Sequence, residues 1–204
     1  MIGHAVINHI DTILSKSTAT KAFENRIDRF SKKRAFALGP NDKAGMTQLA
    51  EDYVRAVADL LIECDVAAEA AGIQRFTSPI IQTAASYFLN AKDYIPDENG
   101  LYGLLDDAYL ACRFIARISD IVFAERGFAL IDASLDDHSP IIRVLIGEPV
   151  ATQLDHDIEN VIRTVLSQIQ MEQLQALQFQ NNWNEWAHRE NVINAEAQIM
   201  SIVN

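Results

Sequence analysis

Four aspartates lie within fifteen residues near the middle of the sequence, at Asp93, Asp97, Asp106 and Asp107. Carboxylate oxygens suit Mg²⁺ and Mn²⁺, and two or three of them can hold such an ion and activate a water molecule. The spacing therefore permits a divalent-metal site with Mg²⁺ or Mn²⁺ as its cofactor. The structural alternative is that these acids cap a helix and accept hydrogen bonds from loop N–H groups.

The residues around these aspartates predict a junction between two helices. Pro96 keeps Ile95 out of the helical region, so the preceding helix must end before it. Residues 97–100 read Asp-Glu-Asn-Gly, which favours a tight turn into the next helix. Asp106 and Asp107 are adjacent on that second helix, so their side chains point about 100° apart. We therefore expect at most one of the two to face the core.

Apolar residues recur at helical spacing through the first half of the chain. In 49–71 they form one continuous stripe with acids on the opposite face, and Gly72 is a suitable stop. Ser78 followed by Pro79 is a typical helix start, with serine as the N-cap and proline at the first helical position. The pattern predicts one helix ending at Gly72 and a second beginning at Pro79.

The segment 101–124 is apolar nearly all round, which is typical of a helix packed on several sides. Ser139 and Pro140 repeat the helix-start signal, for a short helix that ends at Gly147. No segment shows the strict alternation of a strand. The sequence predicts an all-α fold, a compact helical bundle over residues 1–147 with 101–124 at its centre.

The C-terminal segment 150–204 contains no glycine or proline. It is expected to form either one long helix or an αα-hairpin, with Thr152 or Asp155 as the cap at its start. Trp183 and Trp186 lie three residues apart and are candidate packing or interaction anchors. A dimer interface built from this segment is a second interpretation.

Charge is distributed unevenly along the chain. The net charge is −11, yet residues 1–40 hold 7 Lys and Arg against 3 Asp and Glu, and the remainder sums to −15. An acidic body argues against nucleic-acid binding, which needs a positive surface. The helix predicted over 21–34 either packs its apolar stripe on the protein's own core or contacts a partner or an anionic membrane. Its candidate interaction residues are Lys21, Arg26, Arg29, Lys32 and Lys33.

Several classes of protein are excluded by what the sequence lacks. It contains no phosphate-binding glycine loop, nucleophile elbow or zinc-protease motif. No signal peptide is visible, and charges interrupt the most apolar stretch, so we expect no transmembrane segment and a cytoplasmic location. Cys64 and Cys112 fall on apolar helix faces and are predicted to be reduced core residues.

Three stretches carry a family resemblance. Residues 87–89, 93–97 and 103–108 read Tyr-Phe-Leu, Asp-Tyr-Ile-Pro-Asp and Gly-Leu-Leu-Asp-Asp-Ala. They resemble the core motif of the YkvA-like family, a bacterial domain of unknown function, over about residues 79–116. This chain lacks the family's proline before the first aspartate, and it has a polar turn at 98–100 where the family has an apolar one. The resemblance singles out the same four aspartates and implies no reaction.

Three functions follow from these observations. No nucleophile–base arrangement is visible, so the first is a non-enzymatic, cytoplasmic helical module that binds a protein partner or a second copy of itself. The alternative is a divalent-metal-dependent enzyme, of hydrolytic type, that uses the four aspartates. The third is a peripheral protein that contacts anionic lipid through the basic helix over 21–34.

Overall fold

The computed structural model describes residues 2–34, 39, 41–71, 74–90, 94–126 and 138–168, and no strand occurs among them. The prediction of an all-α fold is therefore confirmed. The helices, in chain order, are α1 (Ile2–Leu14), α2 (Lys21–Arg34), α3 (Asp42–Ala71), α4 (Gln74–Leu89), the 3₁₀ turn η1 (Asp97–Asn99), α5 (Leu101–Arg126), α6 (Ser139–Ile146) and α7 (Val150–Gln168).

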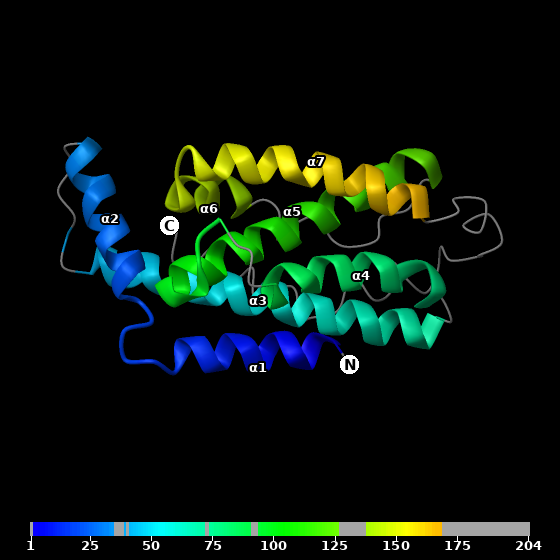
Figure 1. The fold of residues 1–204 in the computed structure, drawn as a ribbon, viewed down its shortest axis with the longest axis horizontal. Coiled ribbons are helices and arrows are strands. Elements are labelled where there is room, and N and C mark those ends of the chain that lie inside the picture. The colour runs from blue at the N-terminus through cyan, green and yellow to red at the C-terminus, as the bar shows by residue number, and fades with distance from the viewer. Residues whose placement is uncertain are drawn as a thin grey trace.

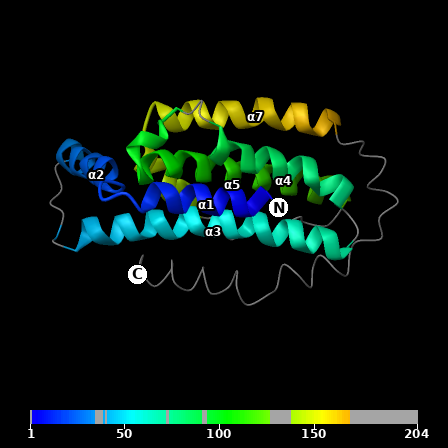
Figure 2. The ribbon, with the colours of Figure 1, turned by 60° about the horizontal axis from the view of Figure 1, so that its bottom comes forward.

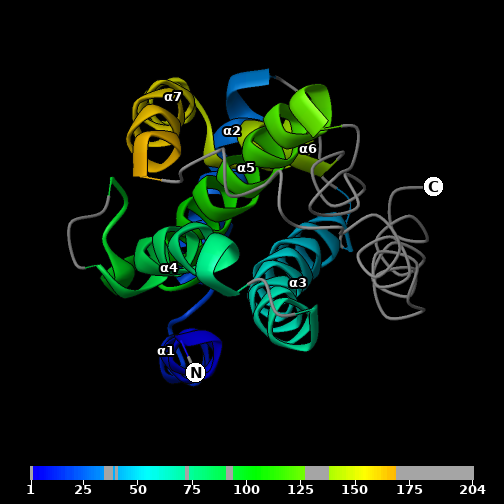
Figure 3. The ribbon, with the colours of Figure 1, turned by 90° about the vertical axis from the view of Figure 1, so that its right-hand side faces the viewer.

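Helix α5 forms the centre of the bundle, as the sequence predicts for 101–124. It packs against α1, α2, α3, α4, α6 and α7, and the view along the bundle shows it between α3, α4 and α7 (Figure 3). The long helices α3, α4, α5 and α7 run side by side, and α1 lies along α3 (Figures 1 and 2). Because neighbours surround α5, its side chains are buried on nearly every face.

The predicted end of α3 is confirmed, whereas the predicted start of α4 is wrong. Helix α3 ends at Ala71, directly before Gly72. Helix α4 begins at Gln74, so Ser78 is no N-cap and Pro79 lies inside the helix. A proline at this position removes one backbone hydrogen bond. Packing of α4 against α3 and α5, which buries Thr77 ahead of the proline, outweighs that loss.

The predicted turn between α4 and α5 is confirmed. Helix α4 ends at Leu89, and the 3₁₀ turn η1 leads into Gly100, which has a positive φ of 63°. The N–H of Leu101 donates to the carbonyl oxygen of Ala19 at 2.8 Å, which links the α1–α2 connection to the first turn of α5. The junction is thereby held against the N-terminal part of the chain.

Helix α2 packs its apolar stripe on the protein's own core. Phe23 and Ile27 are fully buried, which confirms that alternative for these two residues. The Arg26 Nε donates to the carbonyl oxygen of Leu145 at 3.5 Å and so joins α2 to α6. Helix α2 lies at one end of the bundle, across the direction of the long helices (Figure 1).

Helices α6 and α7 close the described part of the chain. The short helix α6 ends at Gly147 as predicted, although its N-cap is His138 and not Ser139. Helix α7 begins at Val150, so the predicted capping by Thr152 or Asp155 is wrong. Asp155 instead accepts hydrogen bonds from the Tyr109 hydroxyl at 2.6 Å and from Arg143 Nε at 3.0 Å. These contacts fix α7 against α5 and α6.

Two further predictions concern the chain as a whole. Cys64 and Cys112 are buried and unbonded to each other, as expected of reduced core residues. Within the described ranges, no helix is both long enough and apolar enough to cross a bilayer. Trp183, Trp186 and the choice between a long helix and a hairpin lie outside the described residues.

Candidate functional site: an acidic cavity

A cavity of about 270 Å³ lies where α4, α5 and α7 meet the loop before η1. Its described lining combines carboxylates, amides and phenols with two aliphatic side chains. The lining residues are Tyr87, Asn90, Tyr94, Asp106, Asp107, Leu110, Asp157, Asn160 and Val161. The cavity is slightly smaller than the range typical of drug-sized ligands, so a smaller molecule would fill it.

Asp106 and Asp107 both line this cavity and are 1% and 2% exposed. The expectation that only one of them faces the interior is therefore wrong. The backbone of Pro96 and Asp97 lies against α5 at Gly103, where an added Cβ would come within 2.9 Å of the Pro96 carbonyl oxygen. The N–H of Ile95 donates to Asp106 Oδ2 at 3.2 Å. Because this loop covers one side of α5 while α4 and α7 cover others, two adjacent side chains are both enclosed.

Asp157 supplies a third carboxylate to the cavity, from α7. The Tyr94 hydroxyl donates a hydrogen bond to Asp157 Oδ2, and Gln153 Nε2 donates to Oδ1 at 3.2 Å. The bond to Asp157 raises the pKa of Tyr94 above its usual value, with burial as a smaller cause. Asn160 lies one turn further along α7 on the same face. Tyr94 therefore ties the loop before η1 to α7 and completes one wall.

The Tyr87 hydroxyl is buried and has no hydrogen-bond partner within the described part of the chain. Burial, and then the negative charge of Asp157, raise the pKa of Tyr87 to about 12. The Tyr87 ring packs edge-on against Phe114 at a centroid distance of 6.2 Å. Burial and the Asp157 carboxylate therefore both disfavour a negative charge at the Tyr87 hydroxyl.

The raised pKa of Tyr87 predicts a loss of stability at alkaline pH. An unfolded tyrosine deprotonates near pH 10, whereas Tyr87 in the folded chain holds its proton until about pH 12. Between these values the folded state binds more protons, so the free energy of unfolding falls as the pH rises. Urea unfolding from pH 9 to 12 should show a shallower decline for Tyr87→Phe than for the unaltered chain. If the free energy of unfolding fell equally steeply with pH in both chains, this prediction would be contradicted.

Among the predicted metal ligands, the structure separates Asp97 from Asp106 and Asp107. Asp97 accepts a hydrogen bond from His9 Nε2 on α1, at 2.9 Å, and is not part of the cavity lining. Asp93 lies outside the described residues. Among the residues that are described, no group of three or more His, Cys, Asp or Glu side chains is arranged to hold a metal ion. Of the three predicted ligands that are described, Asp106 and Asp107 lie together at the cavity, and metal binding by all four stays a prediction.

Sequence reasoning missed the contribution of α7. Acids near the start of the C-terminal segment were expected to act as caps, yet Asp157 lies well inside α7 and faces the cavity. Asp157, Asn160 and Val161 have the i, i+3, i+4 spacing of one helix face. That spacing shows that the three residues share one face of a helix. It does not show which other helix that face packs against, because the tertiary fold decides this.

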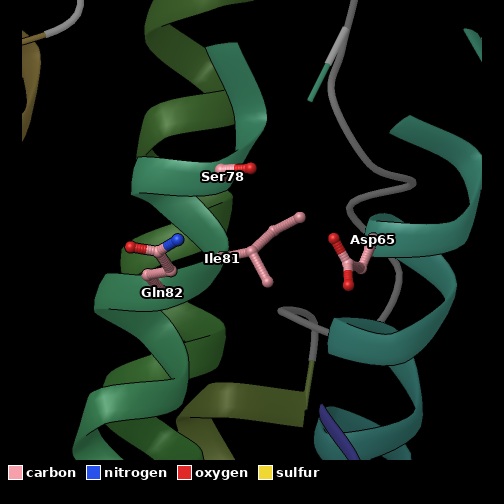
Figure 4. A pocket seen from close by; sticks show the side chains of 4 residues that line it. All are labelled: Asp65, Ser78, Ile81 and Gln82. Atoms are coloured by element: carbon pink, nitrogen blue, oxygen red, sulfur yellow. The ribbon is translucent and has the colours of Figure 1, made fainter. Parts of the chain in front are cut away.

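A second cavity, of about 230 Å³, lies between α3 and α4. Figure 4 shows Ile81 pointing from α4 into the space, with Asp65 of α3 on the opposite side. Its described lining consists of Asp65, Ser78, Ile81 and Gln82. Its described polar groups are one carboxylate, one hydroxyl and one amide, so this cavity carries fewer charged side chains than the acidic one.

The five basic residues predicted to bind a partner differ in their exposure to solvent. Lys21, Arg29, Lys32 and Lys33 are exposed on α2. Arg26 is half-buried and turned towards the carbonyl group of Leu145. Four of the five are therefore accessible to a partner.

In the part of the chain that the structure describes, these features define an all-α bundle with an acidic cavity between α4, α5 and α7. No protein-family model, no curated protein and no solved structure matches the chain. The resemblance of residues 79–116 to the YkvA-like family accordingly stays a prediction from the motif.

Proposed function

We propose that this chain binds a small organic ammonium ion in the acidic cavity. The observation that carries this proposal is that two adjacent aspartates, each almost fully buried, line the same cavity. A third carboxylate, from Asp157, shares it, and none of the described lining residues carries a positive charge. A cationic ligand supplies the opposite charge.

The energetics of burial support a cationic ligand. A carboxylate removed from water must be hydrogen-bonded, paired or neutralised. Asp106 accepts the N–H of Ile95, and a carboxylate can accept about four hydrogen bonds. A bound ammonium group would contribute charge and hydrogen-bond donors at once. The gain from binding is therefore expected to depend on both Asp106 and Asp107.

The apolar part of the lining favours an organic cation over a bare ion. Leu110 and Val161 can cover methylene groups, while the rings of Tyr87 and Tyr94 are suited to cation–π contact. An ammonium group donates up to three hydrogen bonds, which matches the carboxylate and amide oxygens. A short alkylamine or diamine has the right combination of charge and apolar surface.

A hydrated divalent cation is the second candidate. Mg²⁺ often uses one or two carboxylates and retains several water molecules, for which the cavity has room. This form of the metal proposal, with Mg²⁺ or Mn²⁺ at Asp106 and Asp107, does not require Asp97. The same experiment distinguishes the two ligands.

Thermal unfolding tests the proposal directly. After EDTA treatment, the full chain is heated alone and with putrescine, tetramethylammonium, Mg²⁺ or Mn²⁺. A ligand at one hundred times its dissociation constant stabilises a protein by about 2.7 kcal/mol, which for this size raises the melting temperature by about 5–10 °C. We expect putrescine to give this increase, whereas an increase with the metal ions alone would favour the second candidate.

Matched aspartate variants locate the site. Asp157→Asn and Asp107→Asn should abolish the putrescine effect, and Asp157 is the safer substitution because its side chain is only partly buried. Asp120→Asn is the control: it makes the same chemical change on α5, at an exposed carboxylate outside the cavity. No stabilisation by any amine or metal, or an equal loss in Asp120→Asn, would refute the proposal.

A protein-interaction role for the bundle remains a separate proposal. Its C-terminal anchors, Trp183 and Trp186, lie outside the described residues and so contribute no geometry. The basic residues predicted to take part in such an interaction, on α2, do lie within the described residues. Their arrangement favours an anionic surface as the partner.

A further inference from the structure

The exposed face of α2 is a continuous strip of positive charge, hereafter the basic strip, formed by Lys21, Arg29, Lys32 and Lys33. At about 100° per residue, these four side chains fall within about 120° of the helix circumference. The exposed Asn25 shares that arc, and no acidic residue does. Phe23 and Ile27 lie opposite and are buried. The partly buried Ala22 is the one apolar residue within the arc, so the helix presents a predominantly polar, cationic surface.

The acids of α2 are directed elsewhere. Glu24 accepts a hydrogen bond from the Thr20 hydroxyl at 2.9 Å, and Asp28 pairs with Lys43 of α3 at 2.7 Å. No ion pair joins the four basic residues to any described acid. The basic strip is thus not neutralised by the described part of the protein, although the chain carries a net charge of −11.

Apolar side chains are exposed beside α2. Helix α6 contacts α2 through the bond from Arg26 to Leu145, and it exposes Ile141 and Val144 by 38% and 46%. Basic and aliphatic groups therefore occur together at this end of the bundle. That combination is typical of a surface that meets both the headgroups and the upper acyl region of a membrane.

We propose that the basic strip of α2 docks this end of the bundle on an anionic lipid surface. Helix α2 spans about 20 Å, so the four charges can meet several headgroups at once. The strip itself offers no apolar anchor of the kind that a protein interface needs at its centre. It also offers no aromatic side chain for stacking on nucleic-acid bases.

The position of α2 also suits an anionic surface. It lies at the end of an elongated bundle (Figure 1), and α3 alone extends about 45 Å away from that end. Electrostatic forces decay over about 8 Å at physiological salt, so most of the acidic body would stand beyond the range of a surface touched by α2. Local attraction therefore outweighs the overall negative charge.

Vesicle sedimentation tests this inference on the full chain. Phosphatidylcholine vesicles with and without one-third phosphatidylserine are mixed with the protein at low salt and at high salt. We expect binding only to the phosphatidylserine vesicles and its loss at high salt. Each basic residue near such a surface contributes about fivefold to affinity, so Arg29→Gln/Lys32→Gln should weaken binding about 25-fold.

A second double variant controls for net charge. Arg55→Gln/Arg163→Gln removes the same two charges from exposed positions on α3 and α7. It also removes the exposed ion pair between Arg55 and Asp11 of α1, and it should still bind the vesicles as the unaltered chain does. Circular dichroism checks that both variants keep their helices. Absent binding at low salt, equal binding to neutral vesicles, or equal loss in the two variants would overturn the inference. Binding to a DNA duplex without binding to vesicles would overturn it in favour of a nucleic-acid surface.

Discussion

Replacing Gly100 with alanine is expected to lower the free energy of unfolding by about 3–5 kcal/mol. Gly100 has φ 63° and ψ −128°, a conformation that is essentially restricted to glycine. An added Cβ would lie 2.1 Å from the Ala19 carbonyl oxygen and 2.7 Å from its carbon. Both atoms belong to backbone, so no side chain can move aside to relieve the clash.

The loss arises from a specific tertiary contact. The clash separates Ala19 from the start of α5 and so breaks the 2.8 Å bond donated by the Leu101 N–H. That bond holds the α1–α2 connection to the central helix. Urea unfolding monitored by circular dichroism would measure the change, and we expect a lower midpoint with an unchanged slope.

Gly45→Ala is the matched control. Gly45 lies inside α3, and an added Cβ there meets no atom within 4 Å. Alanine favours a helix interior over glycine, so this variant should be more stable by about 0.5–1 kcal/mol. If Gly100→Ala lowers the free energy of unfolding while Gly45→Ala raises it, the loss is caused by the position of Gly100 and not by the added methyl group itself. A Gly100→Ala variant as stable as the unaltered chain would contradict the geometry.

Local chemistry was sufficient to predict the helices and the turn at the centre of the fold. The all-round apolar pattern of 101–124 required several neighbours, and α5 has them. Pro96 and the sequence after it specify an end to one helix and a turn into the next, and both occur. These signals depend on a few adjacent residues, so no tertiary information was needed.

The errors occurred where tertiary contacts outweigh local preference. Ser78 and Pro79 predict a helix start, but α4 extends N-terminally by five residues because that extension packs on its neighbours. The position of Asp155 predicts a cap, but it lies inside α7 and accepts hydrogen bonds from Tyr109 and Arg143. In each case the deciding partner lies on another helix, and sequence spacing does not identify it.

The candidate site was predicted in part for the same reason. Asp106 and Asp107 are close in sequence to the other acids, and this spacing predicts a shared site. In space, Asp97 turns to His9, and Asp157 from α7 takes its place beside them. The chemistry of the residues pointed to a cation, while the set of residues around it depended on the packing of α7 on α5.

Phe114→Ala is expected to lower the free energy of unfolding by about 3–5 kcal/mol, because truncation of a buried phenylalanine leaves a cavity. Phe114 is fully buried on α5 and packs edge-on against Tyr87 of α4, at an interplanar angle of 81°. For a chain of this size, such a loss lowers the melting temperature by about 6–20 °C. Differential scanning calorimetry would measure it.

Phe123→Ala makes the same change on the same helix at a side chain that is 58% exposed, and it should alter stability by less than about 0.5 kcal/mol. The contact between Phe114 and Tyr87 also links the core to the acidic cavity, because Tyr87 lines it. Loss of the Phe114 ring frees Tyr87 to leave its place in the cavity wall, so Phe114→Ala should weaken putrescine binding while Phe123→Ala leaves it unchanged. If Phe114→Ala destabilised the chain yet bound putrescine normally, the Tyr87 ring would have no part in ligand binding, and the carboxylates alone would have to account for it.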